Sequence, residues 1–303
     1  LASNGSLDIR DYQRRFRSFF GPGGRWQGFI DNPTRITLEN FNAIERKAVE
    51  KAQSSMPDGL TEKQKRVLVQ KVMPYTRRLS GDQLAQPVRE AISLTYEEAE
   101  VQEAGIHLAQ TIDRHMVRES GADDMQLPAV SKLPPLVASH CGTSNLLDVV
   151  EAAVRVTNHN DDAVAWAKCA AVLLDGLFRG EGLSASMDAA MTEAPDRDSL
   201  ERARRTSKLD GVAAGESFGR TCYLHEAMPV SFHILSHARS YTEAIRANIH
   251  CGGDSCGRAW LIGPAMAAID EVGGETGIPL SWLARLTDAA SVYQDIESLV
   301  YGS

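Results

Sequence analysis

The residues best suited to chemistry gather in HCGGDSCGRAWLIGPAMAAI, residues 250–269. Two glycines permit a tight or left-handed turn, and an aspartate directly before a helical run can cap its first turn. A carboxylate there can also project into a cleft and bind a hard cation such as Mg²⁺. Asp254 is therefore predicted to be an N-cap or a metal ligand. The helix that follows should bury Ile262, Ala265, Met266 and Ile269.

Cys256 lies two residues after Asp254, where the start of a helix lowers the pKa of a thiol. We consider it a candidate reactive thiol, or else a buried cysteine of the capping region. The chain has five scattered cysteines, mostly within apolar runs, which is typical of reduced thiols rather than a disulfide framework. They favour a reducing intracellular compartment, either the cytoplasm or the interior of an organelle. These cysteines are Cys141, Cys169, Cys222, Cys251 and Cys256.

Two histidine-containing groups contain residue types that can bind zinc. His233 and His237 would share one helix face, but the glutamate of the zinc-binding helix motif is missing from HILSH. His250, Cys251 and Cys256 contain only a lone C-x4-C, without the paired spacing of zinc modules. Both patterns therefore favour structural roles over zinc binding.

The composition excludes several classes of protein. The chain has 303 residues, is 43% hydrophobic and carries a net charge of -8. An acidic balance argues against a nucleic-acid-binding surface. We find no apolar run of the roughly 18 residues that a membrane-spanning helix requires. P-loop and G-x-G-x-x-G motifs are also absent from the sequence, so the common NTPase and dinucleotide-binding classes are disfavoured.

The apolar spacing is helical almost throughout, so we expect an all-α protein with one domain over residues 1–303. The segment LDIRDYQRRFRSFF should form a helix that GPGG ends. Further helices are expected near 35–54, 61–78 and 83–119, the last of them unusually long. This long helix could be an ordinary amphipathic core element or a partner-binding one.

The C-terminal half resembles the ADP-ribosylglycohydrolases, helical enzymes with a GGD-x-D-T segment, an upstream E-A-x-P element and a downstream IP-x-W. The stretches SGADDMQLPAVSKLPPLVA and VTNHNDDAVAWAKCAAVLLDGLF resemble the family's central region. Near the N-terminus, DYQRRF and GFIDNPTR are similar to a branch that includes the jellyfish J-type crystallins and selenoprotein J. The matching positions are Glu226, Ala227 and Pro229 in the upstream element, and Ile278, Pro279 and Trp282 in the downstream one.

The resemblance implies a site that is incomplete here. Active members hold two metal ions, usually Mg²⁺, with an N-terminal T-D-D-T element and the D-x-D-T segment, and the metals position the ADP-ribose diol and a water. Asp254 matches the first aspartate, whereas Cys256 replaces the second and Gly257 replaces the threonine. The T-D-D-T element is missing before the first helix. Because a thiol is a poor ligand for Mg²⁺, we expect no bound metal cofactor.

Three functions follow from this comparison. The first is an inactive member with a structural or scaffolding role, bound to protein partners in a larger assembly. A second is a divergent Mg²⁺-dependent ADP-ribosyl glycohydrolase or an ADP-ribose-binding protein, in which Asp123, Asp124 and His159 converge on a cleft beside Asp254. The third is a thiol enzyme centred on Cys256. We prefer the first, because one retained aspartate cannot hold a binuclear site.

Overall fold

The computed structural model describes residues 7–116, 120–270 and 272–301. Over these residues the chain is helical, and its only β-type pairings are two isolated bridges, so the predicted all-α class is confirmed. The chain divides into two compact units, and we describe each by itself. The N-terminal unit is Ile9–Ser120, and the C-terminal unit comprises the segment from Gly121 onward together with the residues before Ile9. The organisation as one domain over the whole chain stays a prediction.

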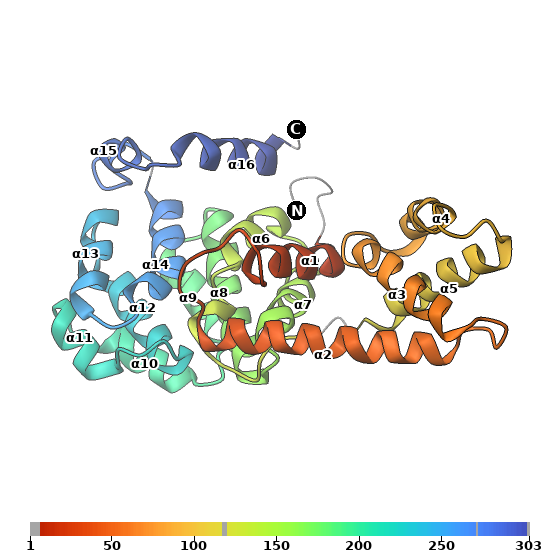
Figure 1. The fold of residues 1–303 in the computed structure, drawn as a ribbon. Coiled ribbons are helices and arrows are strands. Elements are labelled where there is room, and N and C mark those ends of the chain that lie inside the picture. The colour runs from red at the N-terminus through yellow and green to blue at the C-terminus, as the bar shows by residue number, and fades with distance from the viewer. Residues whose placement is uncertain (1–6, 117–119, 271, 302–303) are drawn as a thin grey trace. The chain divides into compact units, whose positions relative to one another are not determined.

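The N-terminal unit begins with α1, which ends before GPGG as the sequence predicts (Figure 1). Asp31 caps α2 by accepting from the Thr34 amide, and Thr61 and Gln64 form a capping box at the start of α3. Apolar residues of α2 to α5 make the core of this unit. Its elements are α1 (Ile9–Phe20), α2 (Asn32–Ser54), α3 (Glu62–Thr76), η1 (Gly81–Leu84), α4 (Ala85–Ser93) and α5 (Ala99–His115).

The long helix predicted over 83–119 is wrong for the residues that the structure describes, and 117–119 lie outside them. The chain breaks after Ser93 into two packed helices, α4 and α5. The amides of Thr95 and Tyr96 both donate to the Ile92 carbonyl, and the Gln102 side chain donates to the Tyr96 carbonyl, so local hydrogen bonds close the turn. The larger apolar side chains of both helices are buried, whereas Leu94 in the turn is exposed.

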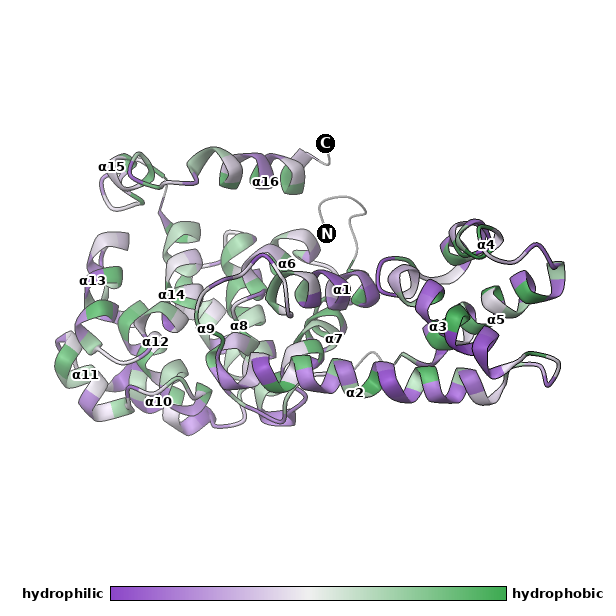
Figure 2. Ribbon diagram, in the orientation of Figure 1, coloured by the Kyte–Doolittle hydropathy of each residue, from purple (hydrophilic) through white to green (hydrophobic). Residues whose placement is uncertain are grey.

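In the C-terminal unit, helices pack around α8, which contacts α6, α7, α9, α12 and α14. Trp166, Cys169 and Leu173 of α8 are buried, and Figure 2 shows more hydrophobic residues along α8 and α14 than along α2. The elements are η2 (Leu127–Ala129), α6 (Leu133–His140), α7 (Leu146–Thr157), α8 (Asp161–Phe178), α9 (Leu183–Ala190), α10 (Arg197–Arg205), α11 (Gly211–Phe218), α12 (Leu224–His237), α13 (Tyr241–Cys251), α14 (Ser255–Ile269), α15 (Leu280–Leu283) and α16 (Ala289–Tyr301).

Helix α14 buries most of its predicted face. Ile262, Ala265 and Met266 are buried as predicted. Ile269 is 43% exposed, so its predicted burial is wrong. Ile269 is the last residue of α14, and Asp270 continues in an extended conformation, so little of the unit covers it. Within the described residues, we find no helix that is both long enough and apolar enough to cross a membrane.

Candidate functional site

Asp254 begins α14 after a glycine turn, as the sequence predicts. Gly252 and Gly253 have φ of 71° and 61°, in the left-handed region that favours glycine. A Cβ on Gly253 would lie 1.8 Å from the Arg220 carbonyl oxygen, so a side chain is excluded there. The Gly257 amide donates to Asp254 Oδ1 over 2.8 Å. The N-cap interpretation of Asp254 is therefore confirmed.

Gly257 closely approaches both the cap and the neighbouring η2 turn. A Cβ at this position would lie 2.6 Å from Asp254 Oδ2 and 2.5 Å from Leu127 Cδ1. Both distances are too short for a real carbon contact, so any larger residue requires Leu127 or the carboxylate to shift. The position at which the resemblance expects a threonine is therefore closely packed around glycine.

Arg258, in the first turn of α14, is a charged residue near Asp254 that no sequence motif indicates. Its side chain is fully buried beneath the cap. Nε donates to Asn248 Oδ1 over 2.8 Å, and Nη2 donates to the Gly252 carbonyl over 2.6 Å. Burial lowers the pKa of Arg258, and the nearby Cys251 and Asp254 oppose that shift. The guanidinium thus ties the glycine turn to α13 and contributes positive charge near Asp254.

Asp123 and Asp124 lie in the loop before η2 and take different partners. Asp123 is exposed and accepts from Asn160 Nδ2 over 2.8 Å. Asp124 accepts from the backbone and the side-chain amide of Gln126 at 2.9 and 2.7 Å. His159 is exposed, and its backbone amide donates to the Ala122 carbonyl. These contacts place all three residues where two loops meet.

Glu226, of the upstream element, organises the loop before α12. Its Oε2 accepts from the amides of Arg220 and Thr221, each over 2.9 Å. These bonds, led by the one from Thr221, lower the pKa of Glu226. The Arg220 carbonyl in turn accepts from the Asp254 amide, and the Cys222 thiol donates to Gln126. Hydrogen bonds therefore link the loops that carry Asp124, Glu226 and Asp254.

A lysine that the sequence analysis did not single out lies under the same loops. Lys132 Nζ donates to Thr157 Oγ1, which donates to Asn158 Oδ1 over 2.8 Å. Asn158 Nδ2 donates to the Asp124 carbonyl. Burial lowers the pKa of Lys132 to about 7. Lys132 lies just before the proline-rich start of α6, and no local pattern predicts its contact with Thr157.

The other ligand-type residues lie apart or bind the backbone. His233 Nδ1 donates to the Ala203 carbonyl and Nε2 accepts from the Leu209 amide, with the hydrogen placed to suit both partners, so its structural interpretation is supported. All five cysteines are free; Cys256 is exposed, whereas Cys169 and Cys251 are buried. The described residues contain no group of three or more His, Cys, Asp or Glu positioned to hold a metal ion.

A cavity of about 520 Å³ lies at α11 and α13 of the C-terminal unit. Its lining includes Asp210, Glu243 and Arg246. None of the predicted site residues Asp123, Asp124, His159, Asp254 and Cys256 lines it. The predicted site and this cavity are therefore separate features of the unit.

Comparison with known proteins identifies the family of the chain. The sequence model of the family described as ADP-ribosylglycohydrolase matches residues 2–301. The chain belongs to the ADP-ribosylglycohydrolase family. A solved structure titled "ADP-ribosylglycohydrolase-related protein complex" aligns with a TM-score of 0.51 and 15% identity, covering 100% of this chain and 99% of that one. At this identity, the likeness shows that the fold is shared.

Two crystallins of the jellyfish Tripedalia cystophora are also similar to this ADP-ribosylglycohydrolase family member. Crystallin J1A is 27% identical over 185 residues, which cover 60% of this chain and 56% of the crystallin. Crystallin J1B is 25% identical over 187 residues, covering 60% and 57%. The chain thus spans just over half the length of these relatives. The matches confirm the predicted resemblance to the crystallin branch.

Proposed function

We propose that this chain is a catalytically inactive ADP-ribosylglycohydrolase-like protein with a structural role in a larger assembly. The observation that carries the proposal is the geometry of Asp254. Its carboxylate caps α14 through Gly257, in a position where a side chain at 257 would collide with Oδ2. A carboxylate held in this way serves the helix, and the family's second aspartate and threonine are replaced by Cys256 and Gly257.

Buried charge at the site supports the same proposal. Arg258 contributes a cation near Asp254, and a bound divalent ion beside it would meet like-charge repulsion. The local charge balance therefore favours a cap with an arginine below it over a metal site.

Two observations support the assembly. Helix α16 exposes apolar side chains in its last three turns, and exposed apolar patches typically mark interaction sites. The residues are Val292, Tyr293, Ile296, Val300 and Tyr301. In addition, the chain is similar to two crystallins, and it shares its fold with a solved structure whose title names a protein complex. We propose a protein partner for this face, and light scattering of the purified chain gives the first test of self-association.

Substitutions at Asp254 test the proposal. Asparagine keeps a capping oxygen, so Asp254→Asn should be nearly as stable as the parent chain, whereas Asp254→Ala should lose about 1 kcal/mol. Chemical denaturation measures both differences. Asp210 caps α11 in the same way, through the Ala213 amide, so Asp210→Ala is the matched control for losing a cap.

The same variants distinguish the inactive protein from the alternative. We expect neither Mg²⁺-dependent release of ADP-ribose from an ADP-ribosylated protein nor heat on titration with ADP-ribose, with an active glycohydrolase assayed in parallel. Activity or binding that disappears in both Asp254→Asn and Asp254→Ala, but survives in Asp210→Ala, would establish a divergent glycohydrolase or ADP-ribose-binding protein instead.

A further inference from the structure

A cluster of arginines surrounds a cavity within the N-terminal unit. Arg10, Arg14 and Arg17 follow one another at helical spacing on α1, and Arg77 comes directly after α3. They line a cavity of about 30 Å³ together with Glu45 of α2. The lining of this cavity thus includes four arginines and one glutamate.

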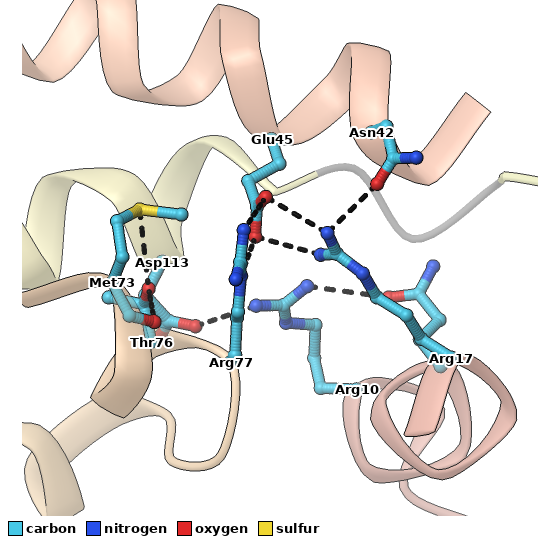
Figure 3. A network of polar contacts seen from close by, with 9 residues as sticks. Arg10, Arg17, Asn42, Glu45, Met73, Thr76, Arg77 and Asp113 are labelled. Atoms are coloured by element: carbon cyan, nitrogen blue, oxygen red, sulfur yellow. Dashed lines mark hydrogen bonds and ion pairs between the residues drawn. The ribbon is translucent and has the colours of Figure 1, made fainter. Parts of the chain in front are cut away.

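Glu45 compensates only part of this charge. Figure 3 shows its carboxylate between Arg17 and Arg77. Arg17 donates to its two oxygens at 2.7 and 3.0 Å, and Arg77 at 2.9 and 2.8 Å. Burial alone would raise the pKa of Glu45, but the bonds and charges of Arg77 and Arg17 outweigh burial and hold it at about 2. One negative charge is therefore shared by two cations.

The other two arginines differ in their partners. Arg10 forms an ion pair with Asp113 over 2.9 Å, which is visible in the same view (Figure 3). Arg14 Nη2 lies 3.6 Å from Asp11 Oδ1, beyond ordinary hydrogen-bond length, while Asp11 binds Arg15 at 2.6 Å. Arg14 Nη1 is buried and has no hydrogen-bond acceptor among the described residues. Arg14 is thus the cation whose charge is least compensated.

We propose that the cavity binds a compact inorganic anion that accepts a hydrogen bond from Arg14 Nη1. A buried charged donor without an acceptor is costly, and a guanidinium pairs especially well with anions. The volume exceeds the roughly 10–15 Å³ that a single water requires, so a small ion has room. An intact nucleotide or sugar does not fit in such a volume, so the ligand class is a halide or a tetrahedral oxyanion.

The experiment uses the full chain with sodium chloride, sodium phosphate or sodium gluconate at matched ionic strength. Hydrogen exchange of peptides from α1 and α3 measures local protection, and calorimetry measures affinity. We expect saturable protection with chloride or phosphate and none with the bulkier gluconate. Protection by chloride alone assigns a halide site, whereas protection by phosphate assigns an oxyanion site.

Arg14→Met keeps most of the side-chain length and removes the donor, so the affinity for the anion should fall at least about tenfold. Arg66→Met is the matched control, because Arg66 is an exposed arginine of α3 in the same unit. If Arg14→Met does not fold, Arg14→Gln and the ³⁵Cl NMR linewidth of the parent chain provide the same test. Equal responses to all three salts, or equal losses in Arg14→Met and Arg66→Met, would mean a water-filled cavity and overturn the proposal.

Discussion

Each unit contains a carboxylate close to arginine side chains, but the arginines use their donors differently. In the N-terminal unit, Arg17 and Arg77 both bind the two oxygens of Glu45. In the C-terminal unit, Arg258 donates to Asn248 and to backbone carbonyls, while the Asp254 carboxylate accepts from the backbone of α14. The carboxylate and guanidinium groups thus bind each other in the N-terminal unit. In the C-terminal unit, those of Asp254 and Arg258 mainly bind backbone groups.

This difference shows that residue type alone does not define a site. Glu45 holds two cations near a cavity, which leaves positive charge available to a ligand. Arg258 uses Nε and Nη2 to fix the turn that precedes Asp254, whereas its buried Nη1 has no hydrogen-bond acceptor among the described residues. Substitutions at Arg258 and Glu45 test this difference between the two units, and the expected loss of stability is larger for Arg258.

Arg258→Met should have the largest effect. It leaves the Asn248 side chain and the Gly252 carbonyl without their buried donor, which we expect to cost about 3 kcal/mol of unfolding free energy. Denaturant unfolding, with hydrogen exchange of α13 and α14 as the local readout, measures the loss. Arg246→Met, at an exposed position on α13, should change stability by less than about 0.5 kcal/mol. Similar losses for the two variants would contradict the supporting role of Arg258.

Glu45→Gln should come next, with a loss of about 2 kcal/mol, because it leaves Arg17 and Arg77 without a shared counter-charge. We place the value below that of a fully buried pair, since the Arg77 side chain is 51% exposed. Hydrogen exchange of α2 and α3 reports on this unit. Glu39→Gln removes an exposed carboxylate of α2 and is the matched control.

The same carboxylate predicts a pH dependence. Its folded pKa of about 2 lies below the ordinary value of 4.5, so the unfolded state binds more protons between these values. The stabilisation by Glu45 is therefore complete above about pH 4.5 and is lost as the pH falls toward 2. Protection of α2 and α3 should decline over that range in the parent chain and decline less in Glu45→Gln. Identical pH profiles would show that Glu45 does not hold the cluster.

The smallest effect concerns thiol accessibility. Cys256 is exposed in the first turn of α14, whereas Cys169 and Cys251 are buried, so iodoacetamide should modify Cys256 first. Mass spectrometry of the native chain near neutral pH gives the order. Fast modification of Cys256 would keep the reactive-thiol hypothesis open, and equally slow modification of all five cysteines would remove it.

Local signals explain most of the helices that the sequence predicted. GPGG ends α1, Asp31 and Thr61 cap α2 and α3, and the glycine pair before Asp254 sets the start of α14. These signals act over a few residues, so the chain displays them directly. Local hydrogen bonds also close the break at residues 94–98, but its sequence, LTYEE, contains no glycine or proline to indicate a turn.

The buried charges could not be predicted in the same way. Arg17 binds Glu45, which is 28 residues distant in sequence, and Arg258 binds Asn248 on the preceding helix. Lys132 likewise donates to Thr157, which is 25 residues distant in sequence. An unusual position, such as an arginine within the apolar run of α14, was the only local signal. The bonding partner of such a residue comes close to it only when the chain folds, so the sequence does not reveal it.

The metal content of the chain tests the central claim most directly. After equilibration with Mg²⁺ and Mn²⁺ and removal of the excess, elemental mass spectrometry should find no stoichiometric metal, and Asp254→Asn should give the same result. Two equivalents per chain, lost in Asp254→Asn, would contradict the claim and make Asp254 a metal ligand rather than a helix cap.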